Sequence, residues 1–153
     1  MERLLRGEAA QLAFGRRLGE AVTAPALLFL EGDLGAGKTT LARGFLQARG
    51  HTGPVRSPTY TLIEPYALPH GTVYHLDLYR LGDPEELEYL GLREMLAEQA
   101  VLLVEWPERG AGWLPPPDLR VHLTYAEAGG ARRLRLEAAT PRGEALCSAL
   151  SGA

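Results

Sequence analysis

Residues 32–39, GDLGAGKT, carry the residue types and the spacing of a phosphate-binding loop. They match the pattern G-x-x-x-x-G-K-[ST] at every fixed position, which chance produces roughly once in 200 chains of this length. The glycines allow consecutive backbone amides to turn inward around phosphate oxygens, where a Cβ would obstruct them. Lys38 would reach the β- and γ-phosphates as a cation, and the Thr39 hydroxyl would bind Mg²⁺. We therefore expect a nucleoside triphosphate to be held by Gly32, Asp33, Leu34, Gly35, Ala36, Gly37, Lys38, Thr39 and Thr40.

Two carboxylates are candidates for the chemistry beside that triphosphate. An enzyme of this kind needs an acid near the magnesium and a group that positions the nucleophile. Glu105 follows the apolar run 101–104, and a carboxylate at the C-terminal end of a buried parallel strand points into the crevice where ligands bind. Asp77 lies in HLDLY, where strand alternation places His75, Asp77 and Tyr79 on one face. The alternatives are a solvated strand-end acid for Glu105 and an edge-strand acid for Asp77, because charged side chains are mostly exposed.

The elements that must position these residues predict a three-layer α/β fold of the P-loop NTPase type, with a mostly parallel central sheet and some antiparallel strands. Residues 26–30 and 101–104 are apolar without alternation, which is typical of strands that are buried on both faces. Asp83 followed by Pro84 is typical of a helix start. The short N-terminus leaves little sequence for a leading strand. Further strands are predicted at residues 59–64, 72–78, 120–125 and 132–137, and helices at 8–22, 39–49, 83–99 with a break at Gly91, and 141–150.

Length, charge and cysteine content exclude several classes of protein. The chain has 153 residues, which is the size of a single domain, so residues 1–153 are expected to form one unit. Its net charge of −3 argues against unaided nucleic-acid binding, since neutralising phosphates needs a basic face. A single cysteine cannot close an internal disulfide. No run approaches about 18 apolar residues and no signal-peptide core is present, so a cytoplasmic protein without membrane contact is expected.

Several classes of nucleoside-triphosphate-binding protein are disfavoured because the sequence lacks their characteristic residues. Guanine-specific GTPases use an Asn-Lys-x-Asp motif, whereas this chain contains no asparagine and no lysine besides Lys38. Its arginines are scattered rather than gathered in a lid for a second substrate. A compact ATPase is therefore the main hypothesis. A small-molecule P-loop kinase and a non-enzymatic nucleotide-sensing interaction module stay open beside it.

Five motifs in a fixed order resemble one protein family. They are GDLGAGKTT at residues 32–40, SPTYTL at 57–62, HLDLYRL at 75–81, DPEEL at 83–87 and VEW at 104–106. Their order and spacing are similar to those of the bacterial TsaE (YjeE) family. The resemblance implies an ATPase that serves threonylcarbamoyladenosine (t6A) synthesis on tRNA with TsaB and TsaD partners, and that meets tRNA only through the complex. It also implies that ATP hydrolysis resets the complex between turnovers, and we expect weak hydrolysis by the isolated chain.

The resemblance assigns roles to residues of three of these motifs. It places Lys38 on the phosphates and both Thr39 and Glu105 on Mg²⁺. Asp77 corresponds to the family's catalytically important acid, either as a base or as a water-positioning group. The expected catalytic set is therefore Asp77, Lys38 and Glu105.

Other roles follow from the resemblance alone. Residues 57–60 correspond to a switch-type segment, whose candidate members are Ser57, Thr59 and Tyr60. Adenine would lie near residues 6–8, so that its expected neighbours are Glu8, Arg132 and Arg133. Two further expectations come from the residues themselves: Arg80, next to the Asp77 strand, is the candidate for stabilising transferred charge, and Trp106 is expected to serve core or interface packing.

Overall fold

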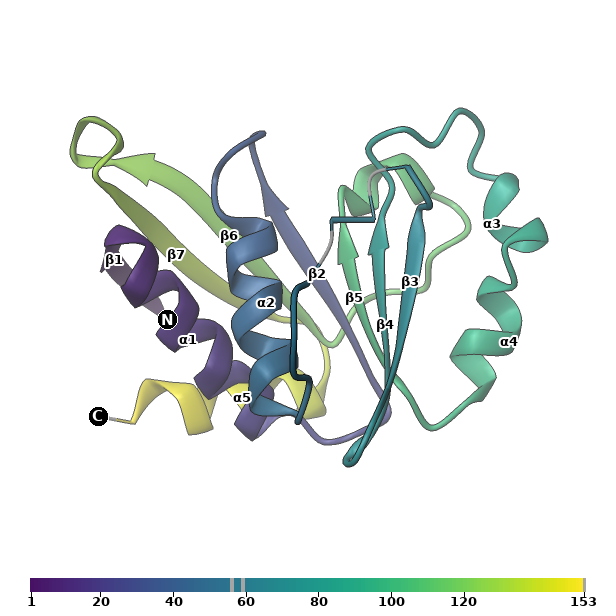
Figure 1. Cartoon of the computed structure of the whole chain (residues 1–153), viewed down its shortest axis with the longest axis horizontal. Coiled ribbons are helices and arrows are strands. Elements are labelled where there is room, and N and C mark those ends of the chain that lie inside the picture. The colour runs from purple at the N-terminus through teal and green to yellow at the C-terminus, as the bar shows by residue number, and fades with distance from the viewer. Residues whose placement is uncertain (56, 59, 153) are drawn as a thin grey trace.

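The centre of the computed structural model, which describes residues 1–55, 57, 58 and 60–152, is a seven-stranded β-sheet (Figure 1). The strands are β1 (Glu2–Arg6), β2 (Ala26–Gly32), β3 (Ile63–Leu68), β4 (Gly71–Asp77), β5 (Val101–Glu105), β6 (Leu119–Ala126) and β7 (Ala131–Ala138). Their order in the sheet is β1-β7-β6-β2-β5-β4-β3. Strands β6, β2, β5 and β4 run parallel, while β3 and the pair β7 and β1 join by antiparallel pairing. The mostly parallel sheet with some antiparallel strands is confirmed.

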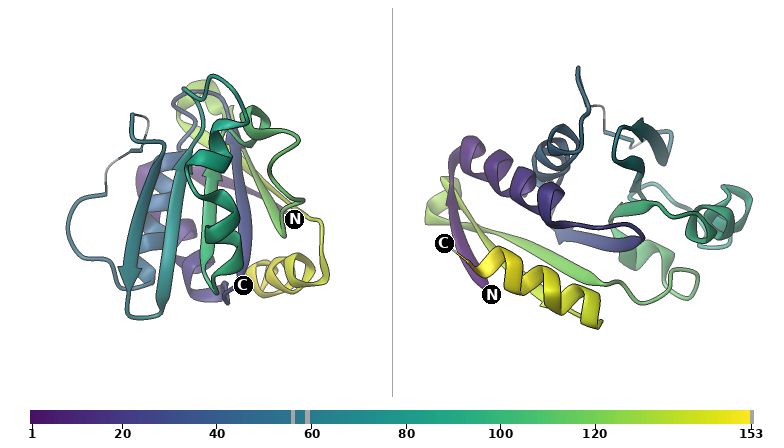
Figure 2. Two further views of the ribbon diagram at one scale, coloured as in Figure 1. Left: turned by 90° about the vertical axis from the view of Figure 1, so that its right-hand side faces the viewer. Right: turned by 90° about the horizontal axis from the view of Figure 1, so that it is seen from below.

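Helices cover both faces of this sheet and give the expected three layers. The helices are α1 (Gly7–Ala21), α2 (Lys38–Ala48), α3 (Glu86–Tyr89), α4 (Leu92–Ala97) and α5 (Pro141–Ser151), with short 3₁₀ helices η1 (Pro107–Gly110) and η2 (Glu127–Gly129). α1 and α2 lie on one face, and α3 and α4 lie on the other (Figures 1 and 2). α5 packs against β7 and α1. Within the described chain we find no helix with the length and apolarity that a membrane span requires.

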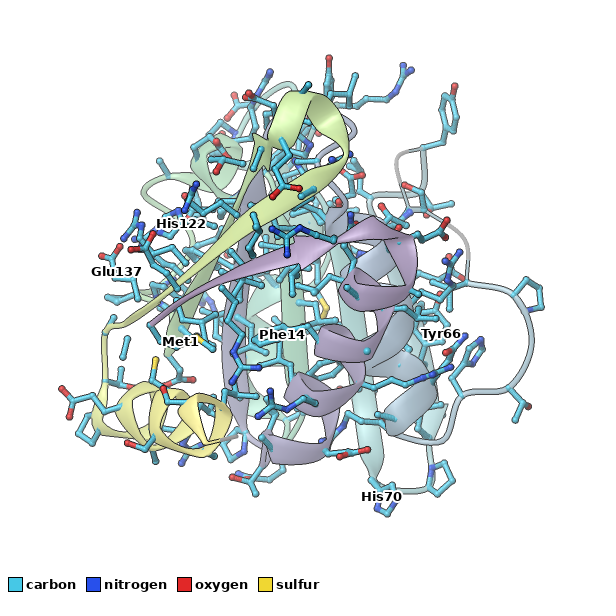
Figure 3. The ribbon with its side chains drawn as sticks, turned by 90° about the vertical axis from the view of Figure 1, so that its left-hand side faces the viewer. Met1, Phe14, Tyr66, His70, His122 and Glu137 are labelled. Carbon is cyan, nitrogen blue, oxygen red and sulfur yellow. The ribbon has the colours of Figure 1, made fainter. Side chains whose placement is uncertain are left out.

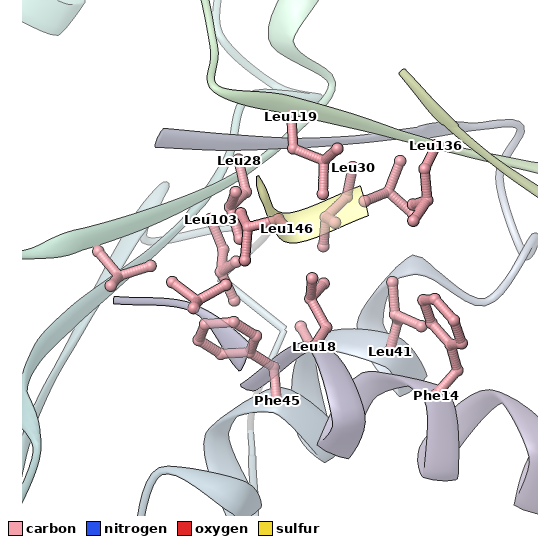
Figure 4. Packing of buried hydrophobic residues seen from close by; sticks show 14 of the residues in the cluster. Phe14, Leu18, Leu28, Leu30, Leu41, Phe45, Leu103, Leu119, Leu136 and Leu146 are labelled. Atoms are coloured by element: carbon pink, nitrogen blue, oxygen red, sulfur yellow. The ribbon is translucent and has the colours of Figure 1, made fainter. Parts of the chain in front are cut away.

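Strand β2 is buried on both faces, as its lack of alternation predicts. Leu28 and Leu30 belong to the core beneath α1 and α2, whereas Leu27 and Phe29 belong to the core beneath α3 and α4. Figure 4 shows the first of these cores, where the Phe45 ring packs with leucines of the sheet. β2 is therefore fixed from both sides, and with it the point at which the following loop begins.

Strands β6 and β7 alternate between core and solvent, as the pattern predicts. Leu123 and Leu134 are paired in the register and point into the core. On the outer face, His122 and Glu137 lie side by side with the histidine Nε2 3.2 Å from a carboxylate oxygen (Figure 3). The hairpin thus has one apolar face that packs and one polar face of paired charges.

Two predictions about strands are wrong. The N-terminus does supply a leading strand, because β1 pairs antiparallel with β7 over residues 2–6. The strand predicted at residues 59–64 is instead β3, which begins at Ile63 and continues through Pro65. Proline lacks an N–H donor, but an edge strand such as β3 has one unpaired side, where that donor is not needed.

The helix predicted to start at Asp83 begins three residues later. α3 starts at Glu86, and the Asp83 carboxylate accepts a hydrogen bond from the Glu85 amide at 2.9 Å within the preceding turn. The predicted break at Gly91 is confirmed, since Gly91 has a left-handed backbone with φ 88° and separates α3 from α4. The other predicted elements are confirmed with small shifts at their ends.

Helices α1 and α2 approach closely because glycines lie at their contact. A Cβ on Gly15 would collide with the carbonyl oxygen of Leu41, and a Cβ on Gly44 would collide with that of Leu12. The backbones therefore touch where larger residues would separate them. This contact sets the position of α2, whose first turn forms one wall of the candidate site.

We expect Gly15→Ala to lower the free energy of unfolding by about 1–3 kcal/mol, although alanine favours an isolated helix by about 1 kcal/mol over glycine. The added methyl group must push α1 away from α2 and loosen buried contacts on both. Urea unfolding followed by circular dichroism measures the change. Gly130→Ala is the control, because Gly130 has a right-handed backbone and a Cβ there would meet its nearest neighbour at 3.4 Å. A Gly15→Ala variant as stable as the wild type would contradict this explanation.

Candidate functional site

The glycine loop, residues 32–39, connects the C-terminal end of β2 to the first turn of α2. Gly35 and Gly37 have left-handed backbones, with φ 81° and 106°, which residues with a Cβ rarely adopt. A Cβ on Gly37 would also collide with the side-chain amide of Gln11, which is buried. The amides at the start of α2 have no partner within the helix, and the helix dipole makes that end positive. The loop is therefore built to receive an anion.

Lys38 brings a buried ammonium group to this loop. The side chain is 4% exposed, and its Nζ donates a hydrogen bond to the Gly32 carbonyl at 2.5 Å. The same Nζ lies 3.6 Å from the centre of the Trp106 ring, within cation–π range. Burial lowers the pKa of Lys38, and this effect outweighs the nearby carboxylates, of which Glu105 contributes most, followed by Asp77. An arriving phosphate would favour the charged form of this lysine.

The two predicted carboxylates lie side by side at the C-terminal ends of neighbouring strands. Asp77 ends β4 and Glu105 ends β5, and the two residues are partners in the parallel register. Both are buried, at 4% and 2% exposed. The Thr39 hydroxyl from α2 lies 3.4 and 3.5 Å from the two oxygens of Glu105. The structure therefore brings together Lys38, Thr39, Glu105 and Asp77, which are far apart in the sequence.

His75 supports Glu105 from inside the sheet. Its ring is fully buried, and Nε2 lies 2.6 Å from Glu105 Oε2. The other ring nitrogen, Nδ1, is buried without a hydrogen-bond partner in the described part of the chain. The one side-chain hydrogen bond of His75 in the described part of the chain therefore orients Glu105. His75 and Asp77, two residues apart on β4, are both buried, whereas Tyr79, the third residue of the predicted face, lies beyond the end of β4.

We expect His75→Phe to reduce the free energy of unfolding by about 2–4 kcal/mol, because it leaves a buried carboxylate without its partner. Guanidinium unfolding of the ligand-free protein measures this. Tyr74→Phe is the matched control on the same strand, since the Tyr74 hydroxyl donates to Glu98 at 2.7 Å near the surface. That bond should be worth less than about 1 kcal/mol. Equal losses of unfolding free energy in the two variants would show that the buried His75–Glu105 pair stabilises the fold no more than the surface bond of Tyr74.

Two cavities meet over the glycine loop. The first, of about 210 Å³, is lined by Leu34, Gly35, Gly37, Lys38, Thr39, Thr40, Glu105 and Trp106. The second, of about 290 Å³, is lined by Gly7, Glu8, Gln11, Gly35, Gly37, Thr40, Gly129, Gly130 and Arg132. They share Gly35, Gly37 and Thr40. An elongated ligand could therefore run from the carboxylates, over the loop, to the start of α1.

Of the three residues expected near a base, two line the second cavity and one does not. Glu8 and Arg132 line the second cavity, as their predicted vicinity to a base requires. Arg133, the next residue on β7, is exposed and does not line it. Sequence reasoning did not single out Gln11, which lines the second cavity beside Gly37, because only the packing of α1 against the glycine loop brings it there.

The expected switch segment is anchored next to Asp77. The Leu62 amide donates to the Pro58 carbonyl at 2.7 Å, and the Asp77 amide donates to the Leu62 carbonyl at 2.9 Å. Ser57 and Tyr60 are both exposed, and Thr59 lies outside the described residues. Neither Ser57 nor Tyr60 lines the first cavity, so their switch role stays a prediction.

Arg80 lies away from both cavities, whereas Trp106 packs as expected and also contacts Lys38. The Arg80 guanidinium lies 4.5 Å from the Tyr60 ring centre and does not line either cavity, so its role in charge stabilisation stays a prediction. Trp106 packs edge-on against Tyr79, with ring centres 4.9 Å apart, as a packing role predicts. It also faces the ammonium of Lys38, because its backbone turns into the left-handed region with φ 56°. A tryptophan directly after the strand-end glutamate was the only sequence signal for this.

Comparison with known proteins places these features in a family. A family model described as "Threonylcarbamoyl adenosine biosynthesis protein TsaE" matches residues 5–134. The chain belongs to the TsaE family. A tRNA threonylcarbamoyladenosine biosynthesis protein TsaE from Haemophilus influenzae is 46% identical over 149 residues, which cover 94% of this chain and 93% of that protein. A TsaE protein from Bacillus subtilis is 42% identical over 125 residues, or 82% and 77% of the two chains.

A solved structure agrees with this membership. The crystal structure of YdiB from Bacillus subtilis superimposes with a TM-score of 0.83 at 32% sequence identity, covering 99% of this chain and 93% of that one. The resemblance to the TsaE family that the five motifs indicated is thereby confirmed. Membership in the TsaE family connects this chain with t6A biosynthesis.

Proposed function

We propose that this chain acts as a single-domain, Mg²⁺-dependent ATPase in the cytoplasm, working with TsaB- and TsaD-type partners in t6A modification of tRNA. In this proposal ATP hydrolysis resets the complex between turnovers. The observation that carries it is the convergence of Lys38, Thr39, Glu105 and Asp77 beside the glycine loop. A loop that only turned a strand into a helix would not need a buried cation and two buried carboxylates, because burying charges is costly.

The donors present fit magnesium. Mg²⁺ prefers hard oxygen ligands and in nucleotide sites takes one or two from the protein, with water and phosphate oxygens completing its shell. The Thr39 hydroxyl and the Glu105 carboxylate are such a pair. Within the described residues no group of three or more His, Cys, Asp and Glu could form an all-protein cage, which is in keeping with a metal shared with phosphate. When bound, Mg²⁺ would supply charge neutralisation on the phosphates.

Each residue then has a separate task in hydrolysis. Lys38 leaves the Gly32 carbonyl and the Trp106 ring to bind the β- and γ-phosphates. Amides of the glycine loop and the start of α2 hold the remaining phosphate oxygens. Asp77 lies beside Glu105 and orients the attacking water or accepts its proton. The net charge of −3 suits a protein that meets partner proteins and leaves tRNA binding to them.

The proposal is tested by reconstitution. Partner proteins and tRNA are supplied with ATP and Mg²⁺, and t6A formation and ADP release are followed with and without this chain. We expect the chain to convert a single round of modification into many rounds, with ADP release that partners stimulate. ADP release that instead depends on an added small phosphoryl acceptor would indicate a kinase. Support of modification with no hydrolysis at any stage would indicate a nucleotide-sensing module.

A further inference from the structure

The outer side of the glycine loop is held by two side chains from the β6–β7 hairpin. Arg132 Nε donates to the Ala36 carbonyl at 2.9 Å, and its Nη2 donates to the Gly35 carbonyl at 3.3 Å. The Tyr125 hydroxyl donates to the Leu34 carbonyl at 2.9 Å. Three consecutive carbonyls of the loop are therefore bound by residues about 90 positions further along the chain.

These bonds have a consequence for the inner side of the loop. The N–H and C=O of one peptide unit point in opposite directions, because the unit is planar and trans. When the Leu34 and Ala36 carbonyls are held from outside, the amides of Gly35 and Gly37 point the opposite way, toward the place of an anion, whereas the Ala36 amide donates to the Asp33 carbonyl at 3.0 Å. The bonds therefore set the orientation of the donors that the cradle needs.

The two clamping residues are themselves fixed. Tyr125 and Arg132 are partners in the β6–β7 register, and the guanidinium lies 4.4 Å from the tyrosine ring centre. The Arg132 Nη1 donates to the carbonyls of Gly129 and Ala131, at 2.9 and 3.0 Å. The hairpin tip is tied to β1 by the ion pair of Arg6 and Glu127 at 2.7 Å. Four of the five N–H groups of Arg132 are thus engaged with backbone carbonyls.

We propose that Arg132 and Tyr125 form a clamp that preorganises the glycine loop for polyphosphate, and that Arg132 is a positioning residue rather than a reader of adenine. This inference rests on the proposed function for the identity of the ligand. It revises the role that the family resemblance suggested for Arg132, whose donors face the loop instead of being available to a base. A loop that is already ordered loses less conformational freedom when it binds, so affinity should depend on the clamp.

The experiment uses two ligands that share phosphates and differ in the base. Binding of Mg²⁺ with ATP, and of Mg²⁺ with tripolyphosphate, is measured by titration calorimetry for the wild type, Arg132→Gln, Arg132→Lys and Tyr125→Phe. We expect Arg132→Gln to weaken both ligands by a similar factor of about 10–100, and Tyr125→Phe by less. Lysine keeps the charge but cannot fork to two carbonyls, so Arg132→Lys should restore little of the loss. Arg133→Gln, an exposed neighbour on the same strand, is the matched control and should bind like the wild type.

A second measurement needs no ligand. Hydrogen exchange of the amides of residues 33–37 in the ligand-free protein should be at least about tenfold faster in Arg132→Gln than in the wild type, with α5 unchanged as an internal reference. Thermal unfolding checks that each variant is folded, and Tyr125→Phe provides a milder change if Arg132→Gln unfolds.

Several outcomes would overturn the clamp. Loss of ATP binding with tripolyphosphate binding unchanged would show that Arg132 contacts the nucleoside. Full rescue by Arg132→Lys, or an equal loss in Arg133→Gln, would show that only positive charge matters. Unchanged exchange of the loop amides would show that the bonds do not order it. If hydrogen exchange of the loop amides rises as expected but the wild type binds neither ligand, the proposed function and the identity of the ligand are both wrong. The conclusion that Arg132 orders the loop would still hold.

Discussion

Lys38→Ala should lower the affinity for Mg²⁺ and ATP by about 100-fold or more and leave no measurable turnover. Lys38 is the only lysine of the chain, and its buried ammonium group lines the first cavity. Each charge-assisted contact with a phosphate is worth about 1.5–3 kcal/mol, and Lys38 is expected to bind two phosphates. Calorimetry gives the affinity, and release of ADP gives the turnover.

Loss of binding in Lys38→Ala can be separated from loss of folding. Burial lowers the pKa of Lys38, so the ligand-free fold disfavours its charged form relative to the unfolded chain. Removing the buried charge offsets part of what the variant loses in its bond to Gly32 and its contact with Trp106, so the ligand-free variant should stay folded with an unfolding temperature close to that of the wild type. Arg16→Ala is the control for loss of a cation, because Arg16 is exposed on α1 and bonds only the side chain of Gln47 within the described chain. Normal ATP binding by Lys38→Ala would remove the basis of the proposed function.

Local sequence patterns were sufficient where the determining forces are local. The glycine loop could be located because each of its positions has a backbone or charge requirement that few residue types meet. β2 and β5 could be located because unbroken apolar runs must be buried on both faces. Glu105 could be linked to the loop because strand ends of a parallel sheet share one edge.

The features that were missed depend on contacts between distant segments. Strand β1 has an ordinary sequence, and only its pairing with β7 makes it a strand. β3 was displaced because Pro65 reads as a break unless the strand is known to lie at an edge. The clamp by Arg132 requires the β6–β7 hairpin to fold back over the loop, which no local pattern contains.

In the candidate site, too, residue types could be predicted from local sequence, whereas contacts between distant segments could not. Lys38, Thr39, Glu105 and Asp77 were chosen by residue type and position, and the fold places them together. The bond of His75 to Glu105 could not be predicted, because strand alternation gives a face but not a partner on the next strand. The contact of Trp106 with Lys38 depends on a left-handed backbone at a non-glycine residue, which is uncommon.

Asp77→Asn should lower the rate of ATP hydrolysis by about 10²–10⁴-fold and change the affinity for ATP by less than about threefold. Asparagine keeps the shape of the side chain and can still accept the hydrogen bond that the Tyr79 amide donates at 3.0 Å. It cannot take a proton, and it carries no charge to orient water. Single-turnover hydrolysis with the partner proteins present measures the chemical step, and calorimetry measures the affinity.

The contrast with Glu105→Gln makes this assignment specific. Glu105 faces the Thr39 hydroxyl, so its substitution should weaken the binding of ATP in the presence of Mg²⁺ and have little effect in EDTA. Asp77 is the register partner of Glu105 on β4, yet its substitution should not change the Mg²⁺ dependence of binding. Asp83→Asn, in an exposed turn, controls for loss of a carboxylate. If Asp77→Asn loses binding and turnover equally, Asp77 belongs to the binding of the nucleotide and another group must position the water.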